Sequence, residues 1–180
     1  MFGLNMVVSK GKTIFIGDTS VHEYPSSEQL AEIAISSARV VRLFGFDPKV
    51  AFVSHSTFGQ PLTSRTKHIK NAVDILKQKN VDFKFDGDMQ PDVALNDKYK
   101  ELYPFSEIVG NANILIMPAL HSAAISTKLM KVFGGGKLIG PLLIGLGLPI
   151  EVAPLRASTS EILNLASIAA YSSDIIDYSF

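Results

Sequence analysis

The chain has 180 residues, 47% of them hydrophobic, which predicts one globular domain with a sizeable core and excludes a disordered chain. Its 17 basic and 17 acidic side chains cancel and no Lys/Arg run occurs, so we expect no binding to nucleic acid or to an anionic membrane. Cysteine is absent, which excludes disulfides and thiolate metal sites and is typical of a cytoplasmic protein.

The first half of the chain alternates short apolar strands with amphipathic helices. Residues 1–12 hold an apolar stretch with no basic segment ahead of it, so they do not predict a signal peptide. The capping box of Ser26 and Gln29 predicts the start of a helix, which Gly45 ends. The other elements expected in this half are strands at 13–16, 49–53 and 83–85 and a helix around 69–76.

The second half continues the same alternation. A strand at 113–117 precedes a helix that starts near His121 or Ser122 and ends at the glycines 134–136. Four apolar side chains at helical spacing are expected to be buried by this helix: Ile125, Leu129, Val132 and Phe133.

The uncharged apolar run at 138–150 is broken by proline and glycine and is too short to span a bilayer. It therefore predicts buried strands at 138–144 and 150–152. Ser158 and Glu161 form a second capping box for the final helix. That helix has only a thin polar stripe, so we expect it to pack against a partner outside this chain.

This order of elements predicts an α/β fold, a three-layer sandwich in which a mostly parallel sheet is covered by helices on both faces. In such sheets, ligands bind at the carboxyl ends of the strands, where the N-termini of helices present free N–H groups. Polar segments at those positions are therefore the candidate binding and catalytic residues.

The segment after the strand at 49–53 is the first candidate. The side chains of Ser54, Ser56 and Thr57, the backbone N–H groups and Gly59 could cradle a phosphate. An equally open interpretation is an ordinary strand-to-helix turn with capping hydroxyls.

Two further segments precede helices. His121 and Ser122 lie where a strand meets a helix N-terminus, which suits an anion, although His121 could equally be a hydrogen-bonded structural residue. Glu161 could act as a general base or could simply cap the helix through Ser158, and the pattern favours capping.

The most polar stretch, DGDMQPDVALN at 86–96, holds three carboxylates. Their spacing is not that of an EF-hand and no histidine supports them, so we predict no metal site. We expect Asp88 and Asp92 to cap helix ends and Asp86 to accept backbone hydrogen bonds.

Five stretches resemble, in order, the C-terminal part of the phosphate acetyltransferase (phosphotransacetylase) family. They are SSEQLAEIA at 26–34, KVAFVSHSTFG at 49–59, DGDMQPDVALN at 86–96, NANILIMP at 111–118 and IGPLLIG at 139–145. Four shorter stretches are similar to the version of this domain that is fused to bacterial NADP-dependent malic enzymes: DTSVH at 18–22, YPF at 103–105, PALHSA at 118–123 and AAY at 169–171.

The resemblance implies two lobes with a cleft between them. Residues 1–148 would form the second lobe, and residues 149–180 would belong to the first lobe, which is mostly absent from this chain. The family uses a Ser-Arg pair before the final helix and an Asp on its first turn. Glu161 stands at the Asp position, Pro154 and Leu155 stand at the Ser-Arg positions, and Arg156 is one residue out of register.

The resemblance therefore implies a non-catalytic domain that senses acetyl-CoA or CoA and holds subunits together in a homo-oligomer, at least a dimer, beside an upstream malic-enzyme domain. No resident cofactor is expected. The alternative is an active phosphate acetyltransferase with Glu161 as the base and Arg156 as the phosphate anchor.

Overall fold

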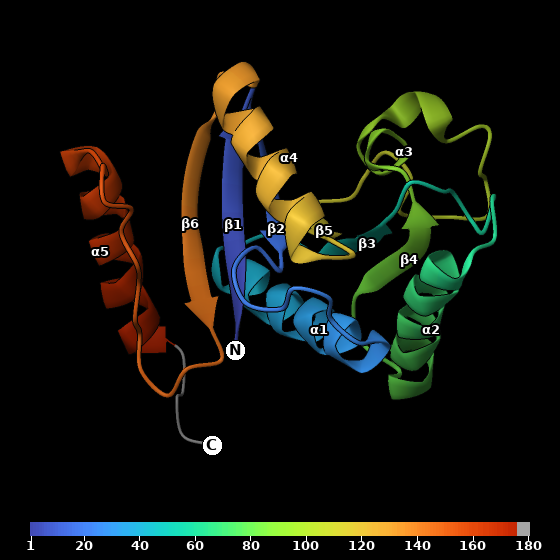
Figure 1. Ribbon diagram of the computed structural model, residues 1–180, viewed down its shortest axis with the longest axis horizontal. Helices are drawn as coiled ribbons and strands as arrows, with labels where there is room; N and C mark the ends of the chain where they lie inside the picture. Colours follow the sequence, from blue (N-terminus) through green and yellow to red (C-terminus); the bar gives the residue numbers. More distant parts are fainter. Residues whose placement is uncertain (176–180) are drawn as a thin grey trace.

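A mixed six-stranded sheet with helices on both faces forms the body of the molecule (Figure 1). The computed structural model describes the backbone of residues 1–175 and the side chains of residues 1–172. The strands are β1 (Phe2–Ser9), β2 (Lys12–Gly17), β3 (Lys49–Val53), β4 (Lys84–Met89), β5 (Ile114–Ile116) and β6 (Lys137–Ile144). The helices are α1 (Ser27–Leu43), α2 (Ser64–Lys79), α3 (Pro91–Leu95), the 3₁₀ turn η1 (Asp97–Tyr99), α4 (Leu120–Phe133) and α5 (Thr159–Ile175).

The strands lie in the order β4-β3-β5-β2-β1-β6. The strands β4, β3, β5 and β2 run parallel, whereas β1 pairs antiparallel with both β2 and β6. The predicted α/β class is confirmed, and the antiparallel pairs of β1 make the sheet mixed. The carboxyl ends of β3 and β5 lie side by side, which is where the predicted ligand segments begin.

One hydrophobic core lies on each face of the sheet, between the strands and the helices that cover that face. Successive residues of a strand contribute to opposite cores, because their side chains point to opposite faces of the sheet. Phe15 and Ile114 face α1 and α2 in one core, whereas Ile16 and Leu115 face α3 and α4 in the other. All four side chains are almost completely buried. Burying each of them contributes about 1.5–3 kcal/mol.

Both predicted capping boxes are present. The Ser26 hydroxyl accepts from the Gln29 N–H at 3.2 Å, and Gln29 Oε1 accepts from the Ser26 N–H at 2.7 Å. Ser158 and Glu161 form the same reciprocal pair at the start of α5. Such caps satisfy backbone N–H groups at the start of the helix, which have no carbonyl partner within the helix.

Two strands differ from the sequence-based expectation. The strand β1 lies inside the sheet between β2 and β6 and was not expected, because Gly3 and Asn5 interrupt its apolar pattern. Gly3 is needed there, since a Cβ would lie 2.5 Å from Ser20 Oγ. The strand β4 continues through Asp86–Asp88, where a Cβ at Gly87 would lie 2.7 Å from Phe52 Cβ.

The apolar side chains of α4 are exposed, so the prediction that they are buried is wrong. Ile125, Leu129, Val132 and Phe133 have exposed fractions of 59%, 53%, 74% and 83%. The helix instead packs through its small residues Ala123 and Thr127, which lets it lie close to the sheet. A second difference is that the strand expected at 150–152 is reduced to one bridge, between Leu142 and Glu151.

The final helix α5 lies beside β6 at one side of the sheet (Figure 1). Leu165 is buried, and the Tyr171 hydroxyl donates to the Leu43 carbonyl at 3.1 Å. Ile162 and Leu163 remain more than half exposed. Among the described helices, none is long and apolar enough to cross a membrane.

A buried carboxylate joins the start of β1 to the end of β2. Asp18 Oδ1 accepts from the N–H groups of Gly3 at 2.8 Å and Ser20 at 2.9 Å, and Oδ2 accepts from the N–H of His22 at 2.8 Å. His22 Nδ1 is also 2.7 Å from Oδ2. Burial tends to raise the pKa of Asp18, but these hydrogen bonds outweigh it and hold the pKa below its ordinary value.

We expect Asp18→Asn to lower the free energy of unfolding by about 2–3 kcal/mol, because the amide removes the charge and half of the acceptor capacity. Urea unfolding at pH 7 measures the change. Asp47→Asn is the matched control, since Asp47 is exposed and its Oδ2 lies 3.6 Å from Lys49 Nζ. Because exposed ion pairs contribute little, this substitution should change the free energy of unfolding by less than about 0.5 kcal/mol. The loss in Asp18→Asn should shrink as pH falls below about 4, where the Asp18 contribution of the parent is itself lost. Equal stability of the two variants would contradict the role of Asp18.

Candidate functional site

A cavity of about 330 Å³ lies at the carboxyl ends of β3 and β5, and we call it the strand-end cavity. Ser54 and His55 line it after β3, Pro118 and Ala119 line it after β5, and Ser122 lines it from the first turn of α4. Two predicted ligand residues, Ser54 and Ser122, therefore meet in one cavity although 68 residues separate them in the sequence.

The other predicted residues of the 54–59 loop are engaged in holding the loop. The Ser56 hydroxyl is completely buried and donates to Asp88 Oδ2, and the Gly59 N–H donates to Asp88 Oδ1 at 3.0 Å. Thr57 Oγ1 accepts from the Gln90 N–H at 3.2 Å. Ser56, Thr57 and Gly59 thus shape the loop and do not line the strand-end cavity.

Asp88 does not cap a helix, contrary to the expectation from the sequence. Gln90 occupies the N-cap position of α3 without a side-chain hydrogen bond, while Asp88 ties the loop after β3 to the end of β4. Asp92 accepts from the Tyr99 hydroxyl at 2.9 Å. Asp86 accepts from the N–H of Gly87 at 2.9 Å. Within the described residues, no cluster of three His, Cys, Asp or Glu side chains is placed to hold a metal ion.

The two residues predicted at the start of α4 point to different surroundings. The Ser122 hydroxyl donates to the Ala119 carbonyl at 2.7 Å and lines the strand-end cavity. His121 is 77% exposed, and its Nε2 lies 3.7 Å from Glu23 Oε1 on the surface. His121 therefore lies outside the cavity.

The strand-end cavity carries basic groups that the sequence did not single out. Arg65 and His68 of α2 line it with His55, and none of the described residues that line it carries a carboxylate. The ring of His68 stacks on Tyr24 with centroids 5.4 Å apart, and its Nε2 donates to the Pro25 carbonyl at 2.7 Å. The combination of a guanidinium, imidazoles and hydroxyls at strand ends suits an anionic group.

A second cavity, of about 370 Å³, lies between α4, β6 and α5, and we call it the α4–α5 cavity. Glu161 and Pro154 line it together with Lys128 and Lys131. Lys128 forms no ion pair within the described residues, whereas Lys131 Nζ lies 3.1 Å from Glu161 Oε1.

The carboxylate of Glu161 is fully engaged in structural contacts. Its Oε2 accepts from the N–H of Ser158 at 2.8 Å and from the hydroxyl of Ser158 at 2.9 Å. The hydrogen bond from the Ser158 N–H, followed by those from the Ser158 hydroxyl and from Lys131, lowers the pKa of Glu161 to about 2. A carboxylate with so low a pKa is a weak proton acceptor at neutral pH.

Arg156, the other predicted catalytic residue, lies in the exposed turn before α5. It lines neither cavity, and no hydrogen bond or ion pair joins it to Glu161 within the described residues. Leu155, at the family's Arg position, is completely exposed.

Two polar residues of the α4–α5 cavity were missed by the sequence argument. Asn5 is 5% exposed, and its Oδ1 has no hydrogen-bond partner; the buried Oγ1 of Thr19 has none either. Both oxygens belong to residues that line the cavity. The sequence did offer one signal for Asn5, which is a polar residue within the apolar stretch of β1.

Comparison with known proteins agrees with this architecture. The model of the phosphate acetyl/butaryl transferase family matches residues 1–170. The NADP-dependent malic enzyme of Rhizobium meliloti is 45% identical over 95% of this chain and 22% of its own length. The phosphate acetyltransferase of Bacillus subtilis is 33% identical over 91% of this chain and 51% of its own length.

Solved structures show the same likeness. A phosphotransacetylase from Streptococcus pyogenes matches with a TM-score of 0.91 and 29% identity, over 96% of this chain and 54% of that chain. The EutD phosphotransacetylase from Staphylococcus aureus matches with a TM-score of 0.88 and 28% identity.

The sheet, its two helical layers and the strand-end cavity define an α/β domain with the phosphotransacetylase fold. The chain belongs to the phosphate acetyl/butaryl transferase family. It spans about a fifth of the malic enzymes and about half of the phosphate acetyltransferases that it matches. The predicted likeness to the phosphotransacetylase-like C-terminal part of malic enzymes is confirmed.

We expect Ser158→Ala to raise the pKa of Glu161 from about 2 toward its ordinary value of 4.5, because the carboxylate loses a hydroxyl donor. Carbon-detected NMR titration of the carboxyl measures this pKa. Because the folded pKa is depressed, Glu161 stabilises the fold above about pH 4.5, and this contribution is lost as pH falls toward 2. Ser160→Ala, two residues after Ser158, is the control and should leave the titration of Glu161 unchanged. A parent pKa near 4.5 would show that the cap does not hold in solution.

Proposed function

We propose that this chain is a non-catalytic phosphotransacetylase-like domain of an NADP-dependent malic enzyme, and that it senses acetyl-CoA and helps to assemble the subunits. Relatives named as NADP-dependent malic enzymes, at 34–45% identity over more than nine tenths of this chain, support the assignment to that kind of protein. Residues 1–148 would serve as one lobe, and residues 149–180 would complete the other.

The engagement of Glu161 is the observation that carries the non-catalytic role. Acetyl transfer to a thiol needs a base, and a carboxylate held by Ser158 and Lys131 with a pKa of about 2 is a poor one. Pro154 and Leu155 offer no cationic fork to a phosphate. The fold is thus retained while the groups that chemistry would need are absent or occupied.

The strand-end cavity is the proposed point of contact for the ligand. The guanidinium of Arg65 supplies a positive charge for one anionic group of acetyl-CoA, and His55, Ser54 and Ser122 add polar groups. A cavity of about 330 Å³ holds only part of such a ligand. The remainder would lie on the surface or against an upstream domain.

We expect acetyl-CoA to bind the parent and Arg65→Ala to weaken binding by about 10- to 100-fold, because a charge-assisted hydrogen bond is lost. Isothermal titration measures the affinity. Arg156→Ala is the matched control, because Arg156 is exposed and outside the cavity, and its affinity should equal that of the parent. Absence of binding heat and of a thermal shift in the parent would reject sensing by this chain.

The alternative is an active phosphate acetyltransferase, which the relatives of that name at 33–36% identity favour. It predicts acetyl-CoA formation from acetyl phosphate and CoA, with loss of activity in both Glu161→Ala and Arg156→Ala. The non-catalytic proposal predicts no formation above background in a coupled assay of the parent. Turnover that disappears in these two variants would replace our proposal with the alternative.

Assembly would use the exposed apolar face of α4. Leu129 and Val132 lie one turn apart on it and are more than half exposed, which is a typical property of an interface. We expect at least a dimer by sedimentation and a monomer after the double substitution Leu129→Ser and Val132→Ser. Leu62→Ser removes an equally exposed leucine from a loop and should leave the dimer intact. A monomeric parent at micromolar concentration would contradict the assembly role.

A further inference from the structure

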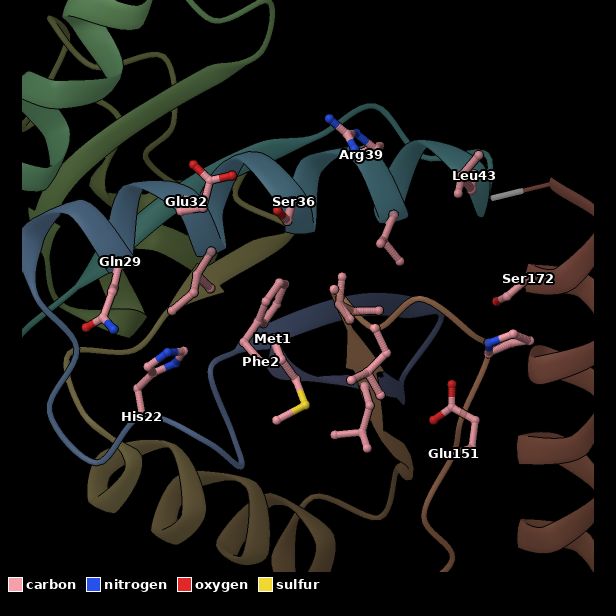
Figure 2. Close-up of a pocket in the computed structure, with 17 residues that line it drawn as sticks. Met1, Phe2, His22, Gln29, Glu32, Ser36, Arg39, Leu43, Glu151 and Ser172 are labelled. Atoms are coloured by element: carbon pink, nitrogen blue, oxygen red, sulfur yellow. The ribbon is translucent and has the colours of Figure 1, made fainter. Parts of the chain in front are cut away.

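A third cavity, of about 500 Å³, lies between α1, the start of β1, the end of β6 and the segment 145–151, and we call it the Glu151 cavity (Figure 2). None of the residues predicted as a site lines it. Its walls are mainly apolar and include Phe2, Val40, Leu143 and Pro149. Its volume is within the range of small-molecule sites.

Glu151 brings one carboxyl group into these apolar surroundings. The residue bridges to Leu142 of β6, and Figure 2 shows its side chain directed toward the apolar side chains of the cavity. The Leu143 N–H donates to the carboxyl, but Oε2 is buried and has no hydrogen-bond partner. An unsatisfied buried oxygen of this kind costs free energy and leaves the Glu151 carboxylate poorly solvated.

The charged and titratable groups around this cavity do not compensate Glu151. His22 Nδ1 is engaged with Asp18, and Glu32 and Arg39, which line the cavity from α1, form no ion pair with Glu151 among the described residues. Met1 also lines the cavity, and within the described residues no ion pair joins it to Glu151. Burial consequently raises the pKa of Glu151 to about 7.

We propose that the Glu151 cavity binds a small primary amine with an apolar body, whose ammonium group pairs with the Glu151 carboxylate. The apolar walls accommodate the body, and the ammonium supplies both the donor and the opposite charge that the carboxylate lacks. A neutral alcohol supplies a donor without the charge, and a carboxylic acid would place a second negative charge beside the first. The geometry therefore selects a cation over an alcohol or an acid of the same shape.

The selection has a pH dependence with a definite sign. An ammonium binds the ionised form of Glu151, so affinity rises as pH increases through about 7 and levels off above it. By linkage, the bound amine lowers the pKa of Glu151. His22, Glu32, Arg39 and Met1 also line the cavity, so the side-chain resonances of His22 and Glu32 are followed in the same experiment.

The test uses n-hexylammonium as the probe at pH 8, with n-hexanol and n-hexanoate as ligands of matched length. We expect saturable binding of n-hexylammonium to the parent by NMR titration, with shifts confined to the cavity residues. Glu151→Gln should weaken it by at least about 10-fold, because one charge-assisted hydrogen bond is lost. Glu101→Gln is the control, since it removes an exposed carboxylate that does not line the cavity, and it should bind as the parent does.

We expect Glu151→Gln to fold, because the amide removes a desolvated charge, and at pH 8 this variant should melt above the parent. A second readout is the carboxyl resonance of Glu151, whose pKa should fall when n-hexylammonium is added. Equal affinity of the parent and Glu151→Gln would overturn the proposal. So would tighter binding of n-hexanoate, or no binding of n-hexylammonium at millimolar concentration.

Discussion

The buried carboxylate of Asp18 is the constraint on which much of this molecule depends. It accepts N–H groups from the start of β1 and from the loop after β2, and so fixes how the antiparallel strand pair meets the parallel part of the sheet. The same loop carries Thr19 into the α4–α5 cavity and His22 into the Glu151 cavity. Asp88 acts similarly at the end of β4, where it orders the loop beside the strand-end cavity. Two buried carboxylates therefore set the shapes of the sites without lining them.

A carboxylate can either stabilise structure or exchange protons, and Glu161 illustrates how strongly one role excludes the other. Hydrogen bonds that lower its pKa also make α5 start at a defined residue and join it to α4 through Lys131. A general base at this position would have to give up those contacts. The family fold is thereby compatible with a chain in which the same acidic position contributes to the packing of helices.

The sequence predicts local features of the fold well, and it predicts the long-range ones poorly. The strand at 49–53 and both capping boxes depend on near neighbours and are found as expected. The interior strand β1 was missed because Gly3 and Asn5 break the apolar pattern for reasons that exist only in three dimensions: Ser20 lies against Gly3, and Asn5 lines a cavity. The prediction that the apolar side chains of α4 are buried was wrong, because helical spacing identifies an apolar face but not what that face contacts. For the site, strand-end position identified Ser54 and Ser122, whereas Arg65 and His68 sit among other polar residues of α2 and give no distinctive signal.

The position of α5 beside β6 has a consequence for self-association. The strand β6 is the last of the sheet, so its outer row of backbone N–H and C=O groups faces no further strand of the sheet, apart from the bridge between Leu142 and Glu151. Such rows recruit extended segments from other chains unless something covers them, and α5 lies alongside this one (Figure 1). The strand at the opposite side, β4, interrupts its own pairing with β3 at Phe52 and Val53 and carries charged residues. The two sides of the sheet are thus protected by different means, and only the protection by α5 can be removed by movement of a helix.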